Sequence, residues 1–556
     1  MKPLFVNQPT PDPSQEGNSR PGAPKSVPLL GGVRGGFVSP IWSTIFYSVA
    51  GAGLLTFSTP HLAPAQQQSA SSSGSAGIPD RPEKLKFPPF EFQPPKPEPY
   101  RVPLKSGPVA YVVPDHELPL VSIAMYIRTG DWVEPDGKEG LADLCGSLLT
   151  RAGTASRSAQ DLEERLAFLA AQLSSHVGGA EGSVSLNLLS KDLEEGLTIL
   201  REVLTEPRFQ PDRIDLQKQQ MLQGLQQRND DSSDIEDREA NFLAYGERFW
   251  DNRHQTAASV ESITREDILA FHKKWFWPSN FVLAVSGDFD RDAMVQKLEK
   301  LFANWPFAGA TPPPIPRDIQ MASPGTYLVD KDVNQGRVVM LLPGIMRENP
   351  DYFSIIMMND ILGGGGFTSR IVNRVRSDEG LAYSAGSSFP GGVYFPYTFR
   401  ASFQSKSRTV AFATSIILEE MKRIMAEPVT TEELDNAKRG YIERIPRSFA
   451  TKAQVANLLA YEEFTGRYAQ EPDYWQKVIP RIRAVTREDV QRVAKKYLTL
   501  DKLVILVVGQ KDEILKGHPD HPVKLADQGG GKFTELPLRD PLTMKPLPLG
   551  STLSAK

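Results

Sequence analysis

The sequence is poor in cysteine and histidine. Its 556 residues include one cysteine, Cys145, and 7 histidines. One cysteine cannot form an intramolecular disulfide, so a hydrophobic core must hold the fold, and a chain of this length needs two or more domains. The net charge of −4 at pH 7 comes without any prominent run of Lys or Arg. The charge therefore gives no reason to expect binding to nucleic acid or to an anionic membrane.

Long apolar runs are also scarce, with one exception near the N-terminus. Ile41–Phe57 reads IWSTIFYSVAGAGLLTF and is followed by Ala63-Pro64-Ala65, the small-x-small form of a signal-peptidase site. We expect residues 1–65 to be a leader cleaved near Ala65, and the protein to be exported to the periplasm. No membrane span is then expected in the mature chain. The alternative is an uncleaved N-terminal membrane anchor.

An internal duplication organises the rest of the chain. The stretch ITREDILAFHKKWFWPSNFVLAVSG is echoed by VTREDVQRVAKKYLTLDKLVILVVG, and Thr264 and Thr486 are 222 positions apart, as are Gly287 and Gly509. In each copy a helix with Thr as its N-cap precedes a β-rich apolar strand. Runs of strands beside runs of helices predict two homologous α+β domains.

Shifts in composition predict the domain boundaries. Segments rich in Pro, Ser or Gly interrupt regular structure and mark linkers and tails. We expect a leader at 1–65, a Pro/Ser-rich linker at 66–99, a first domain at 100–306, a linker at 307–325, a second domain at 326–514 and a flexible tail at 515–556.

Three stretches, GLADLCGSLLTRAGT, EPRFQPDRIDLQKQQMLQGLQQRNDD and LGGGGFTSRIVNRVRSDEGLAYSAGSSF, together resemble the insulinase/pitrilysin family of zinc peptidases. GLADLCGSLLTRAGT (Gly140–Thr154) resembles the zinc helix of that family, Gly-x-Ala-His-x-x-Glu-His followed by Gly-Thr. EPRFQPDRIDLQKQQMLQGLQQRNDD resembles the helix that brings the third ligand, and LGGGGFTSRIVNRVRSDEGLAYSAGSSF resembles the second-domain signature. The resemblance implies two homologous α/β-sandwich halves, each a mixed or antiparallel sheet with helices, that form a clam-like pair.

The positions that carry the zinc chemistry in that family are all substituted here. In the family, two His at i and i+4 bind zinc, and a Glu between them acts as general base on the zinc-bound water. Asp143 and Ser147 stand at the two histidines, Gly146 at the catalytic Glu and Gly224 at the later Glu, and Gln217 replaces a supporting acidic residue. No two histidines of this chain are four residues apart. We therefore expect no metal in this chain and no activity of the chain alone.

Two other motifs have ordinary explanations. Cys145 lies in the apolar stripe of Gly140–Thr154 with no histidine beside it, which is typical of a small core residue rather than a nucleophile. Gly363–Gly366 lacks the Gly-Lys-Ser/Thr of a phosphate-binding loop, so a flexible substrate-facing turn or a plain loop is expected.

The second-domain signature is intact. By resemblance, Arg376 and Tyr383 match the Arg and Tyr that contact the substrate backbone and the developing oxyanion from the domain facing the zinc. A guanidinium and a phenol are suitable donors for a polarised carbonyl. The alternative is that Arg376 pairs with Glu379 on a helix surface and Tyr383 packs in the core. Gly178–Asp192 aligns with the strand that receives the substrate as an added strand, or is an ordinary sheet edge.

The zinc positions of the first domain are substituted, whereas the signature of the second domain is intact. This difference predicts a helper subunit. Some members of the family are heterodimers, in which one subunit carries HxxEH and the other supplies the Arg and Tyr. We expect a non-catalytic subunit of an exported zinc peptidase that binds peptides together with an HxxEH-containing partner, which holds the zinc. The alternative is a structural or peptide-binding protein with no catalytic partner, like the members that are core subunits of a respiratory complex. An independent peptidase would require a metal site that the sequence does not show.

Overall fold

We describe the protein from a computed structural model, and the structure describes residues 91–550. The expected leader at 1–65, its cleavage near Ala65 and most of the expected linker at 66–99 lie outside this range. Among the residues inside it, no helix combines the length and the apolar character that a membrane crossing requires.

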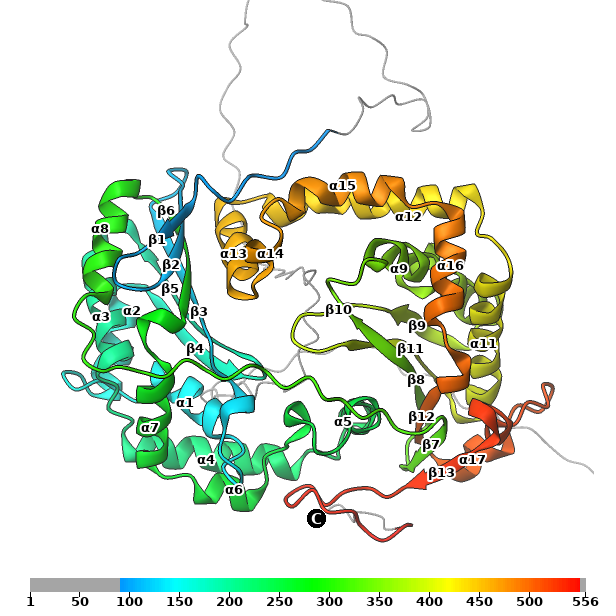
Figure 1. Cartoon of the computed structure of the whole chain (residues 1–556). Helices are drawn as coiled ribbons and strands as arrows, with labels where there is room; N and C mark the ends of the chain where they lie inside the picture. The colour runs from blue at the N-terminus through cyan, green and yellow to red at the C-terminus, as the bar shows by residue number, and fades with distance from the viewer. Residues whose placement is uncertain (1–90, 551–556) are drawn as a thin grey trace, which may run out of the picture. The chain divides into compact units, whose positions relative to one another are not determined.

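The first half of the described chain builds a mixed sheet covered by helices (Figure 1). Its strands are β1 (Arg101–Pro103), β2 (Val109–Pro114), β3 (Leu120–Ile127), β4 (Gln172–Gly178), β5 (Glu181–Leu189) and β6 (Phe281–Gly287). Its helices are α1 (Leu141–Leu149), α2 (Ala159–Phe168), α3 (Leu193–Thr205), α4 (Pro211–Gln226), α5 (Ser232–Tyr245), α6 (Ala257–Ser262), α7 (Arg265–Trp275) and α8 (Arg291–Phe302). The strand order is β1-β2-β6-β3-β5-β4, in which β2 and β6 are parallel and the other neighbours antiparallel.

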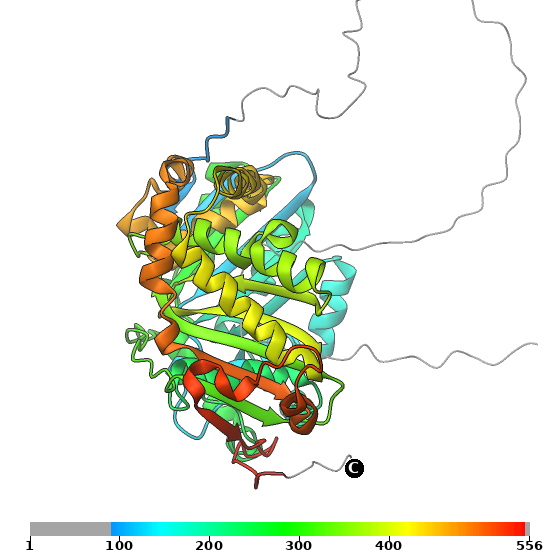
Figure 2. The same cartoon turned by 90° about the vertical axis from the view of Figure 1, so that its right-hand side faces the viewer.

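The second half repeats this plan. Its strands are β7 (Gly325–Asp330), β8 (Gln335–Met346), β9 (Ala382–Ser388), β10 (Gly391–Gly392), β11 (Tyr397–Lys406), β12 (Val504–Gly509) and β13 (Phe533–Leu536). Its helices are α9 (Tyr352–Asn359), α10 (Arg370–Val372), α11 (Val410–Ala426), α12 (Thr431–Arg444), α13 (Lys452–Phe464), α14 (Arg467–Gln470), α15 (Tyr474–Ala484), α16 (Arg487–Tyr497) and α17 (Lys511–Lys516). The order is β13-β7-β12-β8-β11-β9, with β10 beside β8. Figure 2 shows α11, in yellow, lying over one face of this sheet.

The duplication is visible in the local structure and in the topology. Thr264 caps α7 in a capping box with Asp267, and Thr486 caps α16 in the same way with Asp489. The strand that follows each helix takes the same place, because β6 is parallel to β2 and antiparallel to β3, while β12 is parallel to β7 and antiparallel to β8. The predicted α+β fold of two homologous halves is confirmed.

The two halves exchange a helix. Helix α5 belongs to the first half by sequence, yet Ile235 and Leu243 pack with Val339 and Leu506 on β8 and β12. Helix α13 belongs to the second half and packs on β2 and β6 of the first sheet. Each sheet therefore buries apolar side chains against a helix of the other half, and both clusters would be exposed if the halves separated.

The segment after residue 514 differs from the expected flexible tail. Strand β13 pairs in parallel with β7, and the Arg539 guanidinium lies 3.1 Å from the Glu239 carboxylate of α5. The Leu542 carbonyl accepts a 2.8 Å hydrogen bond from the Ala257 backbone N–H. The expectation of a loose tail is wrong for these residues, because their Gly/Pro-rich composition hides a short strand and several backbone contacts to the first half.

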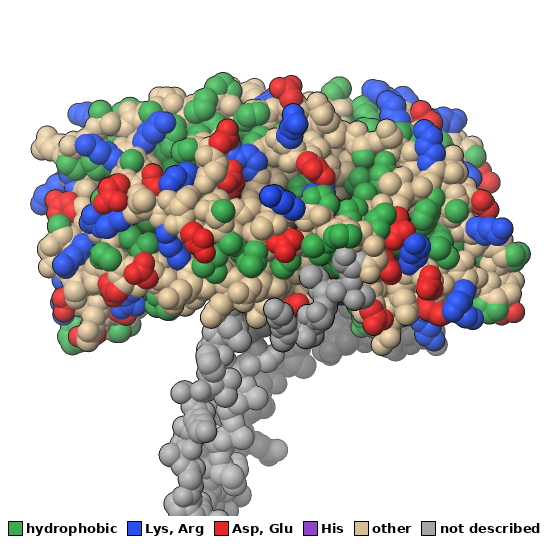
Figure 3. All heavy atoms as spheres, turned by 90° about the horizontal axis from the view of Figure 1, so that it is seen from below, with side chains coloured by type: hydrophobic (Ala, Val, Ile, Leu, Met, Phe, Trp, Pro, Cys, Tyr) green, Lys and Arg blue, Asp and Glu red, His purple; other side chains and the backbone are tan. Residues whose placement is uncertain are grey.

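The face drawn in Figure 3 carries acidic and basic side chains interspersed with apolar ones. On that face no large field of one sign is visible among the described residues. The view agrees with the small net charge of −4, and it shows none of the clustered basic surface that nucleic-acid binding requires.

Candidate functional site

Helix α1 occupies the place of the predicted zinc helix, and its middle is pressed against strand β4. Leu144, Cys145 and Leu148 are buried in the core of the first half. A Cβ added to Gly146 would lie 2.2 Å from the Val177 backbone nitrogen and 2.8 Å from the His176 carbonyl carbon. No side chain fits there without moving β4. The position of the family's general base is filled by the strand itself.

The other substituted positions do not rebuild a metal site. The Ser147 hydroxyl donates to the Asp143 backbone carbonyl at 2.7 Å, and so it is used within the helix. Gly224 lies on the exposed face of α4, and an added Cβ would meet nothing within 4 Å. Within residues 91–550, no group of three His, Cys, Asp or Glu side chains is arranged to hold a metal ion. The residues present do not fit zinc, which needs two or three imidazole or carboxylate ligands at this place.

Cys145 is also unsuited to chemistry. Its side chain is fully buried, and burial raises the pKa of its thiol well above the usual range. A thiol that stays protonated at neutral pH is a poor nucleophile. The sequence-based prediction of a small core residue agrees with this environment.

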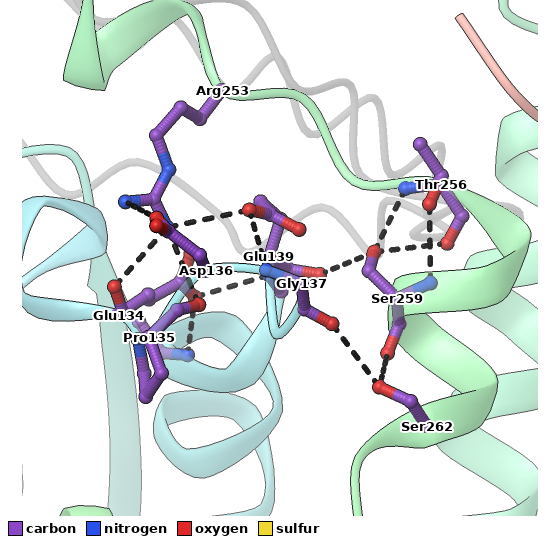
Figure 4. A network of polar contacts seen from close by, with 11 residues as sticks. Glu134, Pro135, Asp136, Gly137, Glu139, Arg253, Thr256, Ser259 and Ser262 are labelled. Carbon is purple, nitrogen blue, oxygen red and sulfur yellow. Dashed lines mark hydrogen bonds and ion pairs between the residues drawn. The ribbon is translucent and has the colours of Figure 1, made fainter.

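A polar network holds the N-terminus of α1 although the zinc ligands are gone (Figure 4). The Glu134 carboxyl accepts hydrogen bonds from the backbone N–H groups of Gly140 (3.0 Å) and Ala142 (2.7 Å). Arg253 donates to the Glu134 carbonyl at 3.1 Å, and Ser259 of α6 donates to the Glu139 carbonyl at 2.9 Å. The Glu134 carboxyl thus satisfies the N–H of the N-cap Gly140 and that of Ala142, which is one of the first N–H groups of α1 without a partner inside the helix.

Glu134 predicts a pH-dependent stability. Burial, together with the neighbouring Asp131, raises the pKa of Glu134 from 4.5 to about 8. Because the folded state holds this proton more tightly than the unfolded state, the contribution of Glu134 to stability is complete below pH 4.5 and is lost as the pH rises through about 8. We expect Glu134→Gln, which keeps an oxygen acceptor and cannot ionise, to flatten the loss of stability between pH 4.5 and about 8.

Urea unfolding at several pH values checks this. The slope that the variant removes is at most about 1.4 kcal/mol per pH unit. Wild type and variant share every other titrating group, so their difference isolates Glu134. An identical pH slope in the two proteins would show that Glu134 is ionised in the fold.

The second-half signature forms an exposed cluster. Arg376 lies in a π-helical turn, Asn373–Asp378, and Tyr383 lies on β9. The Arg376 guanidinium carbon is 4.8 Å from the centroid of the Tyr383 ring and 4.4 Å from that of the Phe367 ring. Tyr383 is 86% exposed and Phe367 is 67% exposed. We call Phe367, Arg376 and Tyr383 the aromatic–arginine cluster.

This geometry excludes the alternative interpretation of the two predicted residues. Tyr383 does not pack in the core, and within residues 91–550 no ion pair joins Arg376 to Glu379. Each of the two rings stabilises the guanidinium by about 0.5–1 kcal/mol at an exposed site. The guanidinium thus lies beside two exposed aromatic rings.

Sequence analysis missed Phe367. It follows Gly363–Gly366, and this turn runs from a second π-helical segment, Asp360–Gly364. The available signal was a large apolar residue directly after four glycines, where no core-facing periodicity explains it. Irregular helical turns of this kind are frequent at functional sites.

The strand expected to receive a peptide is not at an edge. Gly178–Asp192 contains β5, which lies between β3 and β4. The edge strand of the first sheet on this side is β4, whose Ser175 hydroxyl donates to the Gly146 carbonyl of α1 at 2.5 Å. Both interpretations of Gly178–Asp192 required a strand at the sheet edge and are wrong on that point, because two adjacent polar strands give the same alternating pattern.

Both halves of the chain match known protein families. The family described as Insulinase (Peptidase family M16) matches residues 111–244, and the one described as Peptidase M16 inactive domain matches residues 262–441. The relative named Non-peptidase homolog YmxG, from Helicobacter pylori, is 25% identical over 406 residues, covering 71% of this chain and 90% of the relative.

Two solved structures share the fold. One is the peptidase M16 inactive domain from Pseudomonas fluorescens, with a TM-score of 0.65 and 24% identity over 74% of this chain and 97% of that one. The other is the periplasmic protease PqqL from Escherichia coli, with a TM-score of 0.63 and 15% identity over 79% of this chain and 49% of that one. With its two homologous halves and its substituted zinc helix, the chain belongs to the insulinase family of peptidases.

Proposed function

We propose that this chain is a non-catalytic subunit of an exported insulinase-family peptidase. It binds peptides together with an HxxEH-containing partner that carries the zinc, and it presents Arg376 and Tyr383 to the peptide at the partner's active site. The observation that carries the proposal is the contrast between the halves. Gly146 leaves no room for a catalytic side chain, whereas the aromatic–arginine cluster is exposed.

The exposure of the cluster supports a role in binding. Tyr, Phe and Arg side chains are costly to leave in water side by side, and Tyr and Arg are enriched where a partner or ligand covers them. Within residues 91–550, no hydrogen bond or ion pair involves the Arg376 guanidinium. Its N–H donors are thus available to a peptide carbonyl, as a donor to a developing oxyanion must be.

One comparison and the predicted leader support a paired assembly and export. The match to the periplasmic protease covers 49% of that chain, so about half of that chain lies outside the match. We infer that a separate subunit completes the assembly here. The predicted leader at 1–65 supports a periplasmic location.

Isolation of the tagged protein from an envelope extract tests the proposal. The proposal expects a stoichiometric partner that contains HxxEH, identified by mass spectrometry. Recovery of the chain alone or with a non-peptidase complex would overturn it. That outcome would favour the second candidate, a structural or peptide-binding protein without a catalytic partner.

A further inference from the structure

The segment just before the first sheet is docked on the second half. The Phe92 ring lies 5.7 Å from the Phe449 ring, which in turn contacts Trp475 at the start of α15. Pro94 and Pro97 are buried, while the intervening Lys96 is exposed. Residues 92–97 were expected to be part of a linker, yet they pack at a defined position beside α13 and α15.

This position has the features of a polyproline-binding groove. Pro95 and Pro97 line a small cavity together with Leu459, Tyr468, Trp475 and Gln476, so these side chains lie beside the segment. The Gln476 side-chain amide donates to the carbonyls of Pro94 and Pro95, both at 3.2 Å. Polyproline II has three residues per turn and no internal hydrogen bonds, so Pro94 and Pro97 share one face and the carbonyls need outside donors. Aromatic-lined grooves recognise P-x-x-P segments in this way.

The groove lies on a helix that joins the two halves. Leu459 of α13 lines the groove and also belongs to the cluster in which α13 packs on the first sheet, with Tyr111 and Val282. Just beyond the docked segment, Arg101 of β1 makes two 2.9 Å hydrogen bonds to the Glu463 carboxylate of α13. The chain is therefore fixed to α13 at two points.

We propose that residues 92–97 form an intramolecular polyproline latch. The latch occupies a groove built for it between α13 and α15 and holds α13, a helix of the second half, on the sheet of the first half. It opens independently of global unfolding. This inference does not depend on the proposed peptidase function.

Thiol labelling of the full chain tests the latch. Leu459→Cys places a thiol beneath the latch, and the buried Cys145 in the core of the first half reports global unfolding in the same sample. We compare Leu459→Cys alone with the same protein carrying Pro94→Ser/Pro97→Ser or Gln476→Ala. Pro99→Ser, an exposed proline of the same segment, is the matched control.

The latch predicts that both groove variants raise the labelling rate of Cys at position 459 by at least about ten times, the change expected when about 1.4 kcal/mol of docking energy is lost. Labelling of Cys145 and the Pro99→Ser control stay unchanged. Unchanged labelling at position 459 would overturn the proposal. An equal rise in the labelling rates of both thiols would also overturn it, because it would show that the segment opens only with global unfolding. If Leu459→Cys fails to fold, Ala456→Cys, buried on the same face of α13, takes its place.

Discussion

Gly146→Ala is expected to lower the free energy of unfolding by about 3 kcal/mol, the upper end of what overpacking costs. The added methyl group would meet the backbone of Val177 at 2.2 Å, and β4 cannot retreat without breaking its pairing with β5. Ala is otherwise the better helix former by about 1 kcal/mol, so a net loss would come from the clash alone. Urea unfolding followed by circular dichroism measures the difference.

Gly224→Ala is the matched control for this substitution. It adds the same methyl group at another degenerate position, where nothing lies within 4 Å. We expect a gain of about 1 kcal/mol from helix propensity. Equal behaviour of the two variants would contradict the close contact between α1 and β4.

The contact also predicts that the zinc motif cannot be restored by substitution alone. A variant with Asp143→His, Gly146→Glu, Ser147→His and Gly224→Glu has the ligands by sequence, but the side chain at position 146 has no space beside β4. We expect this protein to misfold rather than to bind one zinc ion. Stoichiometric zinc in a folded variant, measured by metal analysis, would contradict the account.

The second large effect is expected at the aromatic–arginine cluster. In the assembly with its partner, Arg376→Ala is expected to lower kcat by about 10²–10³-fold, the usual cost of losing one oxyanion donor. Tyr383→Phe is expected to act in the same direction. Phe367→Ala removes one ring beside the guanidinium and should have a smaller effect than Arg376→Ala. Peptide hydrolysis by the reconstituted assembly measures all three.

The melting temperature and the pairing with the partner serve as controls. Because Tyr383 and Phe367 are mostly exposed, substitutions in the cluster should leave the melting temperature within about 2 °C of wild type. Arg408→Ala, a surface arginine of the same half that pairs with Glu513, is the matched variant and should keep full activity. Full activity of Arg376→Ala would leave the cluster without a catalytic role.

Sequence reasoning was strongest where the signal is local or repeated. The capping residues Thr264 and Thr486 and the apolar strands that follow their helices carry their own structural preference, so the duplication and the fold class could be predicted. The substituted positions Asp143, Gly146, Ser147 and Gly224 could be located by resemblance. The reason that position 146 has no room for the general base could not be predicted, because it depends on the distance to β4, about thirty residues away in the sequence.

Sequence reasoning failed where the outcome depends on tertiary contacts. The sequences of α5 and α13 predict helices but do not show which sheet each one packs on, and α13 buries residues on more than one side rather than along a single face. Pro94 and Pro97 look like linker residues until the groove beside Gln476 is known. The exposed Phe367 ring lies against Arg376, and no periodicity reveals such a pair.

The most direct test of the account is peptide hydrolysis by the HxxEH-containing partner, measured with and without this chain. The account predicts little turnover by the partner alone, none by this chain alone, and full turnover when the two are mixed at equal concentration. The Arg376→Ala/Tyr383→Phe variant should still pair with the partner, but the mixture should not regain turnover. A partner that is fully active alone, or a zinc-dependent activity of this chain by itself, would contradict the central claim.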